Sequence, residues 1–155
     1  MAETVERSWC VVVPHDARGA RTARHRLAEE FTGLLPPALL ADVVTALAEL
    51  VGNAVRHADA LPGGVVRVTW RLLTAEGTRQ AEIRVTDGGA TGPPLMRTVG
   101  HDSVDGRGLR IVTALADRWG VERDGLGQSV WARWRVAPAE TRRAGLVPVA
   151  GPIPA

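Results

Sequence analysis

The stretch ELVGNAVRH, residues 49–57, decides how this 155-residue sequence is interpreted. It ends a run, from about Ala38 to His57, in which apolar residues recur every three or four positions, and that period predicts one long amphipathic helix. Glu49, Asn53 and His57 stand at i, i+4 and i+8, so they share one edge of the buried stripe. We therefore expect a carboxylate, an amide and an imidazole to line up beside the core.

Two of these side chains suit phosphate chemistry. The side-chain oxygen of Asn53 is a hard, neutral ligand of the kind that binds Mg²⁺. This ion usually keeps several water ligands and is also coordinated by substrate phosphates. Glu49, one turn earlier, can orient or deprotonate a nucleophile beside that ion. A helix edge that carries Glu and Asn is more often only a boundary between buried and wet surfaces. The triplet therefore needs support from other segments.

A second segment, Asp87-Gly88-Gly89, follows a pair of expected strands. Residues 65–72 and 81–86 alternate apolar and polar side chains around a turn at 75–78, which predicts an antiparallel hairpin with one wet face. A carboxylate at the end of such a strand can accept a hydrogen bond from an exocyclic amine such as that of adenine. The glycines after it let the backbone pass close to a flat ring. The same letters also describe an ordinary Asp-Gly turn.

A third segment, Gly106-Arg107-Gly108-Leu109, opens a helix expected to run to about Ala116. Glycines at a helix start expose backbone N–H groups, and the N-terminal end of a helix favours anions. Arg107 can add the positive charge that Lys supplies elsewhere. The alternative is a flexible loop that simply leads into a helix.

The chain contains no Lys, so all 19 of its basic residues are Arg. This excludes a Walker A loop, a protein kinase with a strand lysine and a pyridoxal phosphate enzyme, each of which needs a Lys. The net charge is only +2, so we do not interpret the high isoelectric point as a nucleic-acid footprint. Cys10 is the single cysteine, which favours a reduced cytoplasm, and we expect neither a signal peptide nor a membrane span.

The order of the expected elements predicts an α+β fold. We expect a two-layer α/β sandwich in which one mixed, mostly antiparallel sheet carries the helices on one face. The expected domain comprises residues 9–136, preceded by an extension at 1–8 and followed by a flexible tail at 137–155. The strands are expected at 9–13, 65–72, 81–86, 119–123 and 128–136, and the helices at 18–31, 38–57 and 106–116.

The placement of the tryptophans follows the strand alternation. Trp9, Trp70 and Trp134 fall on apolar positions and are expected in the core. Trp131 points to the opposite face from Trp134 and is expected at a surface or partner contact.

The three segments in this order resemble the GHKL (Bergerat-fold) ATP-binding superfamily. The small size and the Glu-Leu-Val-x-Asn-Ala-Val-x-His pattern resemble its anti-sigma-factor serine/threonine kinase branch. The resemblance extends over residues 9–136, which is nearly everything but the tail. It implies the Bergerat fold, with ATP and Mg²⁺ as cofactors.

The resemblance also implies a role for each matching position. Asn53 would hold Mg²⁺ and Glu49 would be the catalytic carboxylate. Asp87 would bind the adenine amino group, and Gly89 would make room for the ring. The remaining positions are Gly106, Arg107, Gly108 and Leu109 at the helix start that cradles phosphates, and Ser129, where the family usually has a Thr near the adenine.

Residues 90–105 would form the ATP lid. The family's glycine box usually ends in a further Gly, but this sequence has Thr91 at that place. Because Thr lacks the backbone freedom of Gly, the lid hinge is expected to differ.

The implied function is phosphorylation of an anti-sigma-factor antagonist, sequestration of a sigma factor, or both, by a cytoplasmic protein. The resemblance also allows a homodimer. One alternative is a catalytically weak or inactive interaction module of the same fold that switches partners. Another is a nucleic-acid binder that uses the helix with Arg18 to Arg26 and the pair Arg142-Arg143, but the small net charge and the few aromatics disfavour it. A histidine kinase is also disfavoured, because no dimerisation helices with a phosphoacceptor His are expected.

Overall fold

The computed structural model describes residues 2–89 and 104–136 of the chain, with side chains described from residue 109 onward in the second range. The expected tail at 137–155 lies outside these residues, and so does nearly all of the expected lid at 90–105. Thr91 also lies outside them.

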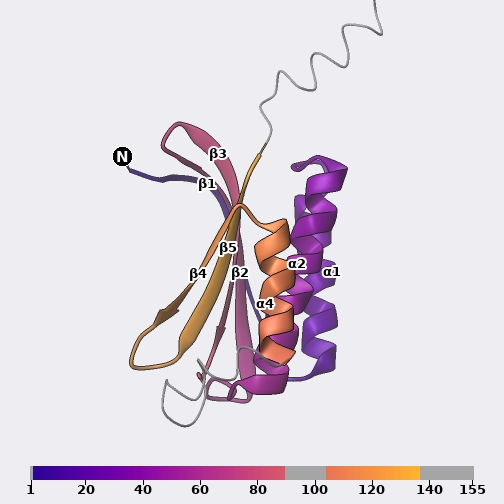
Figure 1. Ribbon diagram of the computed structural model, residues 1–155, viewed down its shortest axis with the longest axis vertical. Coiled ribbons are helices and arrows are strands. Elements are labelled where there is room, and N and C mark those ends of the chain that lie inside the picture. Colours follow the sequence, from indigo (N-terminus) through magenta and orange to yellow (C-terminus); the bar gives the residue numbers. More distant parts are fainter. Residues whose placement is uncertain (1, 90–103, 137–155) are drawn as a thin grey trace, which may run out of the picture.

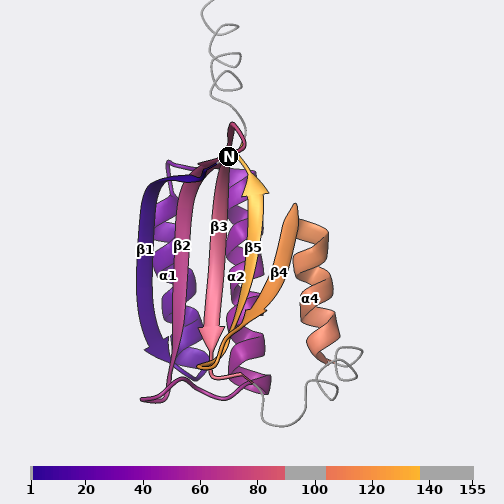
Figure 2. The same ribbon diagram turned by 90° about the vertical axis from the view of Figure 1, so that its left-hand side faces the viewer.

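The described elements form two layers (Figure 1). They are β1 (Thr4–Pro14), α1 (Ala17–Phe31), α2 (Pro37–His57), β2 (Val65–Ala75), β3 (Thr78–Asp87), α4 (Val104–Leu115), β4 (Arg118–Arg123) and β5 (Gln128–Arg135). Figures 1 and 2 show that the helices lie on one face of the sheet. We call the other face, which no described helix covers, the uncovered face.

The strands follow the order β1-β2-β3-β5-β4 across the sheet. Every pairing between described strands is antiparallel. The expected two-layer α+β sandwich is therefore confirmed, although the described strands form no parallel pair of the kind that a mixed sheet contains.

Strand β1 begins at Thr4 and not at Trp9, so part of the expected N-terminal extension belongs to the sheet. Thr4 lies opposite Thr74 of β2, and a register shift interrupts the pairing between Val5 and Arg7. The residue pattern carries no strand signal in this segment because its side chains are mostly polar. Its position in the sheet depends on backbone pairing with β2, which polar side chains allow as well as apolar ones.

The tight turn between β2 and β3 fixes the register of the hairpin. Glu76 and Gly77 both have positive φ, 55° and 75°, as in the two-residue turns that match the natural twist of paired strands. Ala75 and Thr78 therefore lie opposite each other. From this start, β3 runs to Asp87 at the other end of the sheet.

The core lies between the helices and the sheet, and tryptophans form part of it. Trp70 is fully buried, and the ring of Trp9 stacks on it at 6.5 Å while meeting Phe31 edge-on at 5.5 Å. Trp134 is 2% exposed, and its Nε1 donates to the carbonyl oxygen of Leu115 at 2.8 Å. The expected core positions of Trp70 and Trp134 are confirmed, whereas Trp9 is partly buried and packs against the core.

Helix α2 is long and apolar enough to cross a membrane by length and composition alone. Val43, Leu47, Leu50 and Ala54 lie on its buried face and belong to the core. Packing of this face against the rest of the domain accounts for the apolar composition of α2.

The uncovered face carries a charged network centred on Glu82, which is 2% exposed. Arg71 Nε donates to Glu82 Oε1 at 2.9 Å, and Arg133 Nε donates to Glu82 Oε2 at 2.8 Å. Glu3 also pairs with Arg133 at 2.8 Å. Burial alone would lower the pKa of Arg133, but its hydrogen bonds to Glu82 and Glu3 raise that pKa. The Arg133 guanidinium is therefore held charged against the sheet.

Trp131 lies on the same uncovered face, as the strand alternation predicts. Its ring covers Gly120 so closely that a Cβ at Gly120 would come within 2.7 Å of it. The guanidinium carbons of Arg118 and Arg133 lie 6.0 and 5.8 Å from the ring centre.

Candidate functional site

Helix α2 holds Glu49 and Asn53 on a half-buried edge, as expected from their spacing. Asn53 Oδ1 accepts a hydrogen bond from Arg56 Nη2 at 3.1 Å. The guanidinium of Arg56 folds back over Gly52, where a Cβ would lie 2.9 Å from Arg56 Nη1. Arg56 is exposed, so this hydrogen bond can be exchanged for another partner at low cost.

Asp87 ends strand β3 and is 3% exposed. Its Oδ1 accepts a hydrogen bond from the backbone N–H of Gly89 at 2.7 Å. Gly89 has φ of 82°, a conformation that side chains disfavour, and among the described residues a Cβ there would meet nothing within 4 Å. Gly89 is therefore needed for its backbone conformation.

The segment after α2 is tied directly to the glycines after Asp87. Gly88 N donates to the carbonyl oxygen of Asp59 at 2.7 Å, and Asp59 N donates to the carbonyl oxygen of Gly89 at 2.8 Å. A Cβ at Gly88 would collide with the carbonyl oxygen of Ala60. The backbone of residue 60 approaches closely at Gly88, so Gly88 is required for space, whereas Gly89 is required for its backbone conformation. Together these contacts fix Asp87 relative to the end of α2.

His15, which the sequence analysis did not single out, closes the C-terminal end of α2. Its Nε2 lies 2.8 Å from the carbonyl oxygen of Ala54 and 2.9 Å from that of Ala58. An Nε2–H group can donate to these two oxygens, and the carbonyl oxygen of Ala54 also accepts from the backbone N–H of Ala58 at 3.2 Å. A residue from the β1–α1 connection therefore binds the C-terminal end of α2.

Ser129 lies one register position away from the residue that pairs with Asp87. It lies opposite Thr86, and their hydroxyl oxygens are 2.7 Å apart. The residue opposite Asp87 is Gln128, which is 7% exposed. Because successive side chains of a strand point to opposite faces, Ser129 lies on the uncovered face and Gln128 on the helix side.

Helix α4 begins at Val104, so Gly106, Arg107 and Gly108 fall within its first turns and not before it. The side chain of Arg107 lies outside the described ones. Leu109 is half-buried and packs against the core. Figure 2 shows that α4 begins at the end of the molecule where β3 ends. The expected phosphate end and the expected adenine end of the site therefore lie on the same side.

Comparison with protein families accounts for this arrangement. The family described as the histidine kinase-like ATPase domain matches residues 13–134, which is more than half of the chain. The chain belongs to this family. No match was found among curated protein sequences.

A solved structure similar to this ATPase-like domain is the crystal structure of the RsbU and RsbW domains of Rv1364c from Mycobacterium tuberculosis. The two share 22% sequence identity with a TM-score of 0.62. The match covers 84% of this chain and 32% of that chain, so this chain spans about a third of the other's length. At this identity, the likeness shows a shared fold.

Membership of the histidine kinase-like ATPase family implies ATP binding, and the resemblance further implies Mg²⁺. Among the residues that the structure describes, no group of three His, Cys, Asp or Glu side chains is arranged to hold a metal ion. Asn53 is a suitable type of ligand for Mg²⁺, because its side-chain oxygen is neutral and lies at a half-buried edge. The hydrogen bond that this oxygen now accepts comes from the exposed Arg56, which can move away. Its other ligands would have to come from phosphate and water.

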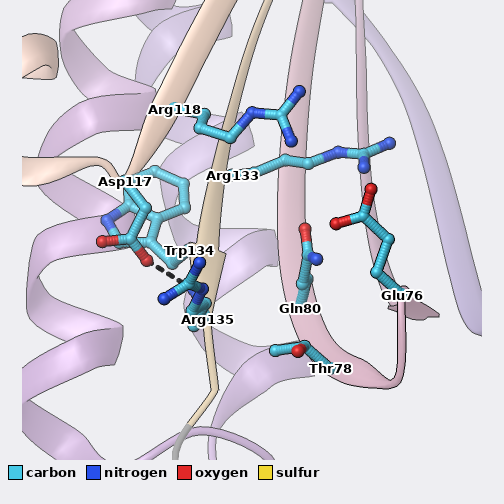
Figure 3. Close-up of a pocket in the computed structure, with 8 residues that line it drawn as sticks. All are labelled: Glu76, Thr78, Gln80, Asp117, Arg118, Arg133, Trp134 and Arg135. Atoms are coloured by element: carbon cyan, nitrogen blue, oxygen red, sulfur yellow. Dashed lines mark hydrogen bonds between the residues drawn. The ribbon is translucent and has the colours of Figure 1, made fainter.

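A hollow of about 240 Å³ lies at the other end of the sheet of this ATPase-like domain (Figure 3). None of the expected site residues lines it. Its walls mix both signs of charge, and Arg133 is already bound by Glu82 and Glu3. The lining residues are Glu76, Thr78, Gln80, Asp117, Arg118, Arg133, Trp134 and Arg135.

Proposed function

We propose that this domain binds ATP with Mg²⁺ and transfers the γ-phosphoryl group to a Ser or Thr hydroxyl of a partner protein. The proposed partner is an anti-sigma-factor antagonist that is phosphorylated, a sigma factor that is sequestered, or both. We further propose that the protein is a cytoplasmic homodimer and binds neither nucleic acid nor membrane. The family match, the motif pattern and the fold shared with an RsbU–RsbW structure support it.

The observation that carries the proposal is the rigid link between Asp87 and α2. The hydrogen bonds that join Asp59 to Gly88 and Gly89 hold the buried carboxylate beside the end of the helix that carries Asn53 and Glu49. A site built from one strand end and one helix can hold the adenine ring and the phosphate chain of ATP at a fixed separation. Phosphoryl transfer depends mostly on such positioning and on charge neutralisation.

Each residue of the proposed site has one task. Asp87 accepts a hydrogen bond from the adenine amino group, and Glu49 accepts the proton of the incoming hydroxyl. Asn53 Oδ1 holds Mg²⁺, which when bound neutralises charge on the phosphates. Arg56 releases Asn53 on nucleotide binding and is then available as a cation near the phosphates of a chain that has no Lys.

Glu49→Gln tests the catalytic assignment. The variant keeps the size of the side chain but removes the base, so phosphotransfer should fall by about 100-fold or more while ATP affinity stays within about twofold. The substrate protein is captured from a native lysate with and without ATP and is then incubated with radiolabelled ATP. The matched control is Glu29→Gln on the exposed side of α1, which should transfer phosphate at the wild-type rate.

Asn53→Ala tests the metal assignment. Calorimetric titration with ATP should show that Mg²⁺ strengthens binding to the wild type but not to this variant. Wild-type transfer rates in Glu49→Gln would refute the role of Glu49. If the wild type binds Mg²⁺-ATP and transfers nothing to any captured protein, the domain is an interaction module and the kinase proposal is wrong.

A further inference from the structure

Three polar side chains form a row across the end of the sheet, on the helix side. Gln128 of β5 lies opposite Asp87 of β3 on one flank and opposite Arg123 of β4 on the other. Val130 and Ala132, which follow Gln128 at alternate positions, contact or belong to the core, so Gln128 faces the helices as Asp87 does. Asp87 and Gln128 are 3% and 7% exposed.

Close backbone packing holds Gln128 at this place. A Cβ at Gly127 would collide with the carbonyl oxygen of Asp87, so the residue before Gln128 has to be glycine for the strand end to approach so closely. The turn that leads into β5 is also fixed, because Asp124 Oδ1 accepts from the N–H groups of Leu126 and Gly127 at 2.8 and 2.9 Å. The start of β5 is therefore rigid beside Asp87.

Arg123 determines which way the Gln128 amide points. Arg123 Nε donates to Gln128 Oε1 at 3.1 Å. A guanidinium has donors and no acceptor, so the amide oxygen has to face Arg123 and the Nε2 amino group has to face away from it. The orientation of an amide is otherwise decided only by its hydrogen-bond partners. Arg123 thus gives Gln128 a fixed donor on the side away from β4.

From this geometry we infer that Gln128, oriented by Arg123, donates a hydrogen bond to N1 of the adenine ring and makes the site selective for adenine over guanine. The inference rests on the proposed function, in which Asp87 accepts from the adenine amino group. Adenine presents a donor at position 6 next to an acceptor at N1, which matches a carboxylate beside an amide N–H. Guanine presents the reverse pair, O6 and N1–H, and mismatches both groups.

The test measures the affinities of Mg²⁺-ATP, Mg²⁺-GTP and Mg²⁺-1-deaza-ATP, which lacks the N1 acceptor. The wild type should prefer ATP to GTP by at least about 100-fold and lose about tenfold with 1-deaza-ATP. Gln128→Met, which keeps length and removes both amide groups, should lose about tenfold for ATP and bind 1-deaza-ATP no worse than ATP. Ser129→Ala is the matched control, because its hydroxyl bonds Thr86 on the uncovered face.

Arg123 is a positioning residue, and its variants separate orientation from mere structure. In Arg123→Met the amide can turn and present Oε1 to guanine N1–H, so GTP affinity should rise while ATP affinity falls, and the preference should shrink by at least about tenfold. Arg123→Lys retains a donor and should keep the preference. Because Arg123 is exposed, both variants are expected to fold, and circular dichroism melting checks this.

Two results overturn the inference in different ways. If Gln128→Met binds Mg²⁺-ATP as tightly as the wild type, and the wild type binds Mg²⁺-1-deaza-ATP as tightly as Mg²⁺-ATP, Gln128 does not contact the adenine ring, while the proposed function stands. If the wild type binds none of the three nucleotides, the proposed function fails and the inference fails with it.

Discussion

Replacing Glu82 with Gln should lower the free energy of unfolding by about 2 kcal/mol, although the change removes a single charge. Glu82 is 2% exposed, and each of its oxygens accepts one short hydrogen bond, from Arg71 and from Arg133. In Glu82→Gln, one arginine keeps an acceptor and the other faces an amino group. One charge-assisted hydrogen bond is therefore lost, which typically costs about 1.5–3 kcal/mol.

The estimate stays below the roughly 3–5 kcal/mol that breaking a buried ion pair can cost, because the arginines retain some access to water. The side chains of Arg71 and Arg133 are 25% and 14% exposed, so each can turn partly outward when its acceptor is lost. Glu3 remains beside both and offsets part of the unpaired positive charge.

Urea unfolding at pH 7, followed by the fluorescence of the five tryptophans, measures the effect. The matched control is Glu122→Gln, which removes an ion pair with Arg84 at 2.6 Å on a side chain that is 63% exposed. That control should cost less than about 1 kcal/mol and should lose its effect in 0.5 M NaCl, since salt screens exposed charges far more than buried ones. The loss in Glu82→Gln should persist in the same salt.

A change below about 0.5 kcal/mol in Glu82→Gln would refute this reasoning. Abolition of the loss by 0.5 M NaCl would refute it too, because the pair would then behave as an exposed one. Either result would mean that water on the uncovered face hydrates the two arginines as well as Glu82 binds them, and that the network adds nothing to stability.

Three further predictions follow from the described contacts. Gly88→Ala should destabilise the fold by about 2 kcal/mol or more and weaken ATP binding, because its Cβ would collide with the Ala60 carbonyl, whereas Gly125→Ala, in open space, should do neither in the same melting and titration assays. His15→Ala should cost about 1–2 kcal/mol in urea unfolding by removing the imidazole hydrogen bonds to the carbonyl oxygens of Ala54 and Ala58, and an unchanged midpoint would contradict this. The side-chain hydrogen bond from Arg18, together with the Gly19 backbone N–H, lowers the pKa of Asp16. The contribution of Asp16 to folding stability is therefore full above its ordinary pKa of 3.8 and is lost as the pH falls through the lowered folded pKa. The decline of stability between pH 5 and pH 2 should accordingly be shallower in Asp16→Asn.

Much of the fold follows from local patterns in the sequence. The period of α2 and the spacing of its Glu49 and Asn53 predicted a half-buried polar edge, and the structure places both residues on such an edge. The strand alternation placed Trp134 in the core and Trp131 on the opposite face, as observed. These predictions succeed because helix and strand periods fix the direction of each side chain relative to its own element.

Pairing between distant segments was not predictable in the same way. Ser129 and Gln128 are adjacent and both polar, and only the register of β5 on β3 decides that Gln128 lies opposite Asp87. A shift of one residue would have exchanged their faces. The resemblance points to Ser129, whereas the register places Gln128 opposite Asp87.

The sequence by itself determined which residue types stand at the helix edge, at the end of β3 and at the start of α4, because these depend on local spacing. Only the tertiary structure decided that His15 closes α2, that Gly88 touches Ala60 and that Arg123 orients Gln128. Each of these contacts joins elements whose separation is set by the packing of the whole core against the sheet. Hydrogen bonds act over about 3 Å, so they depend on that packing and leave no periodic signal in the chain.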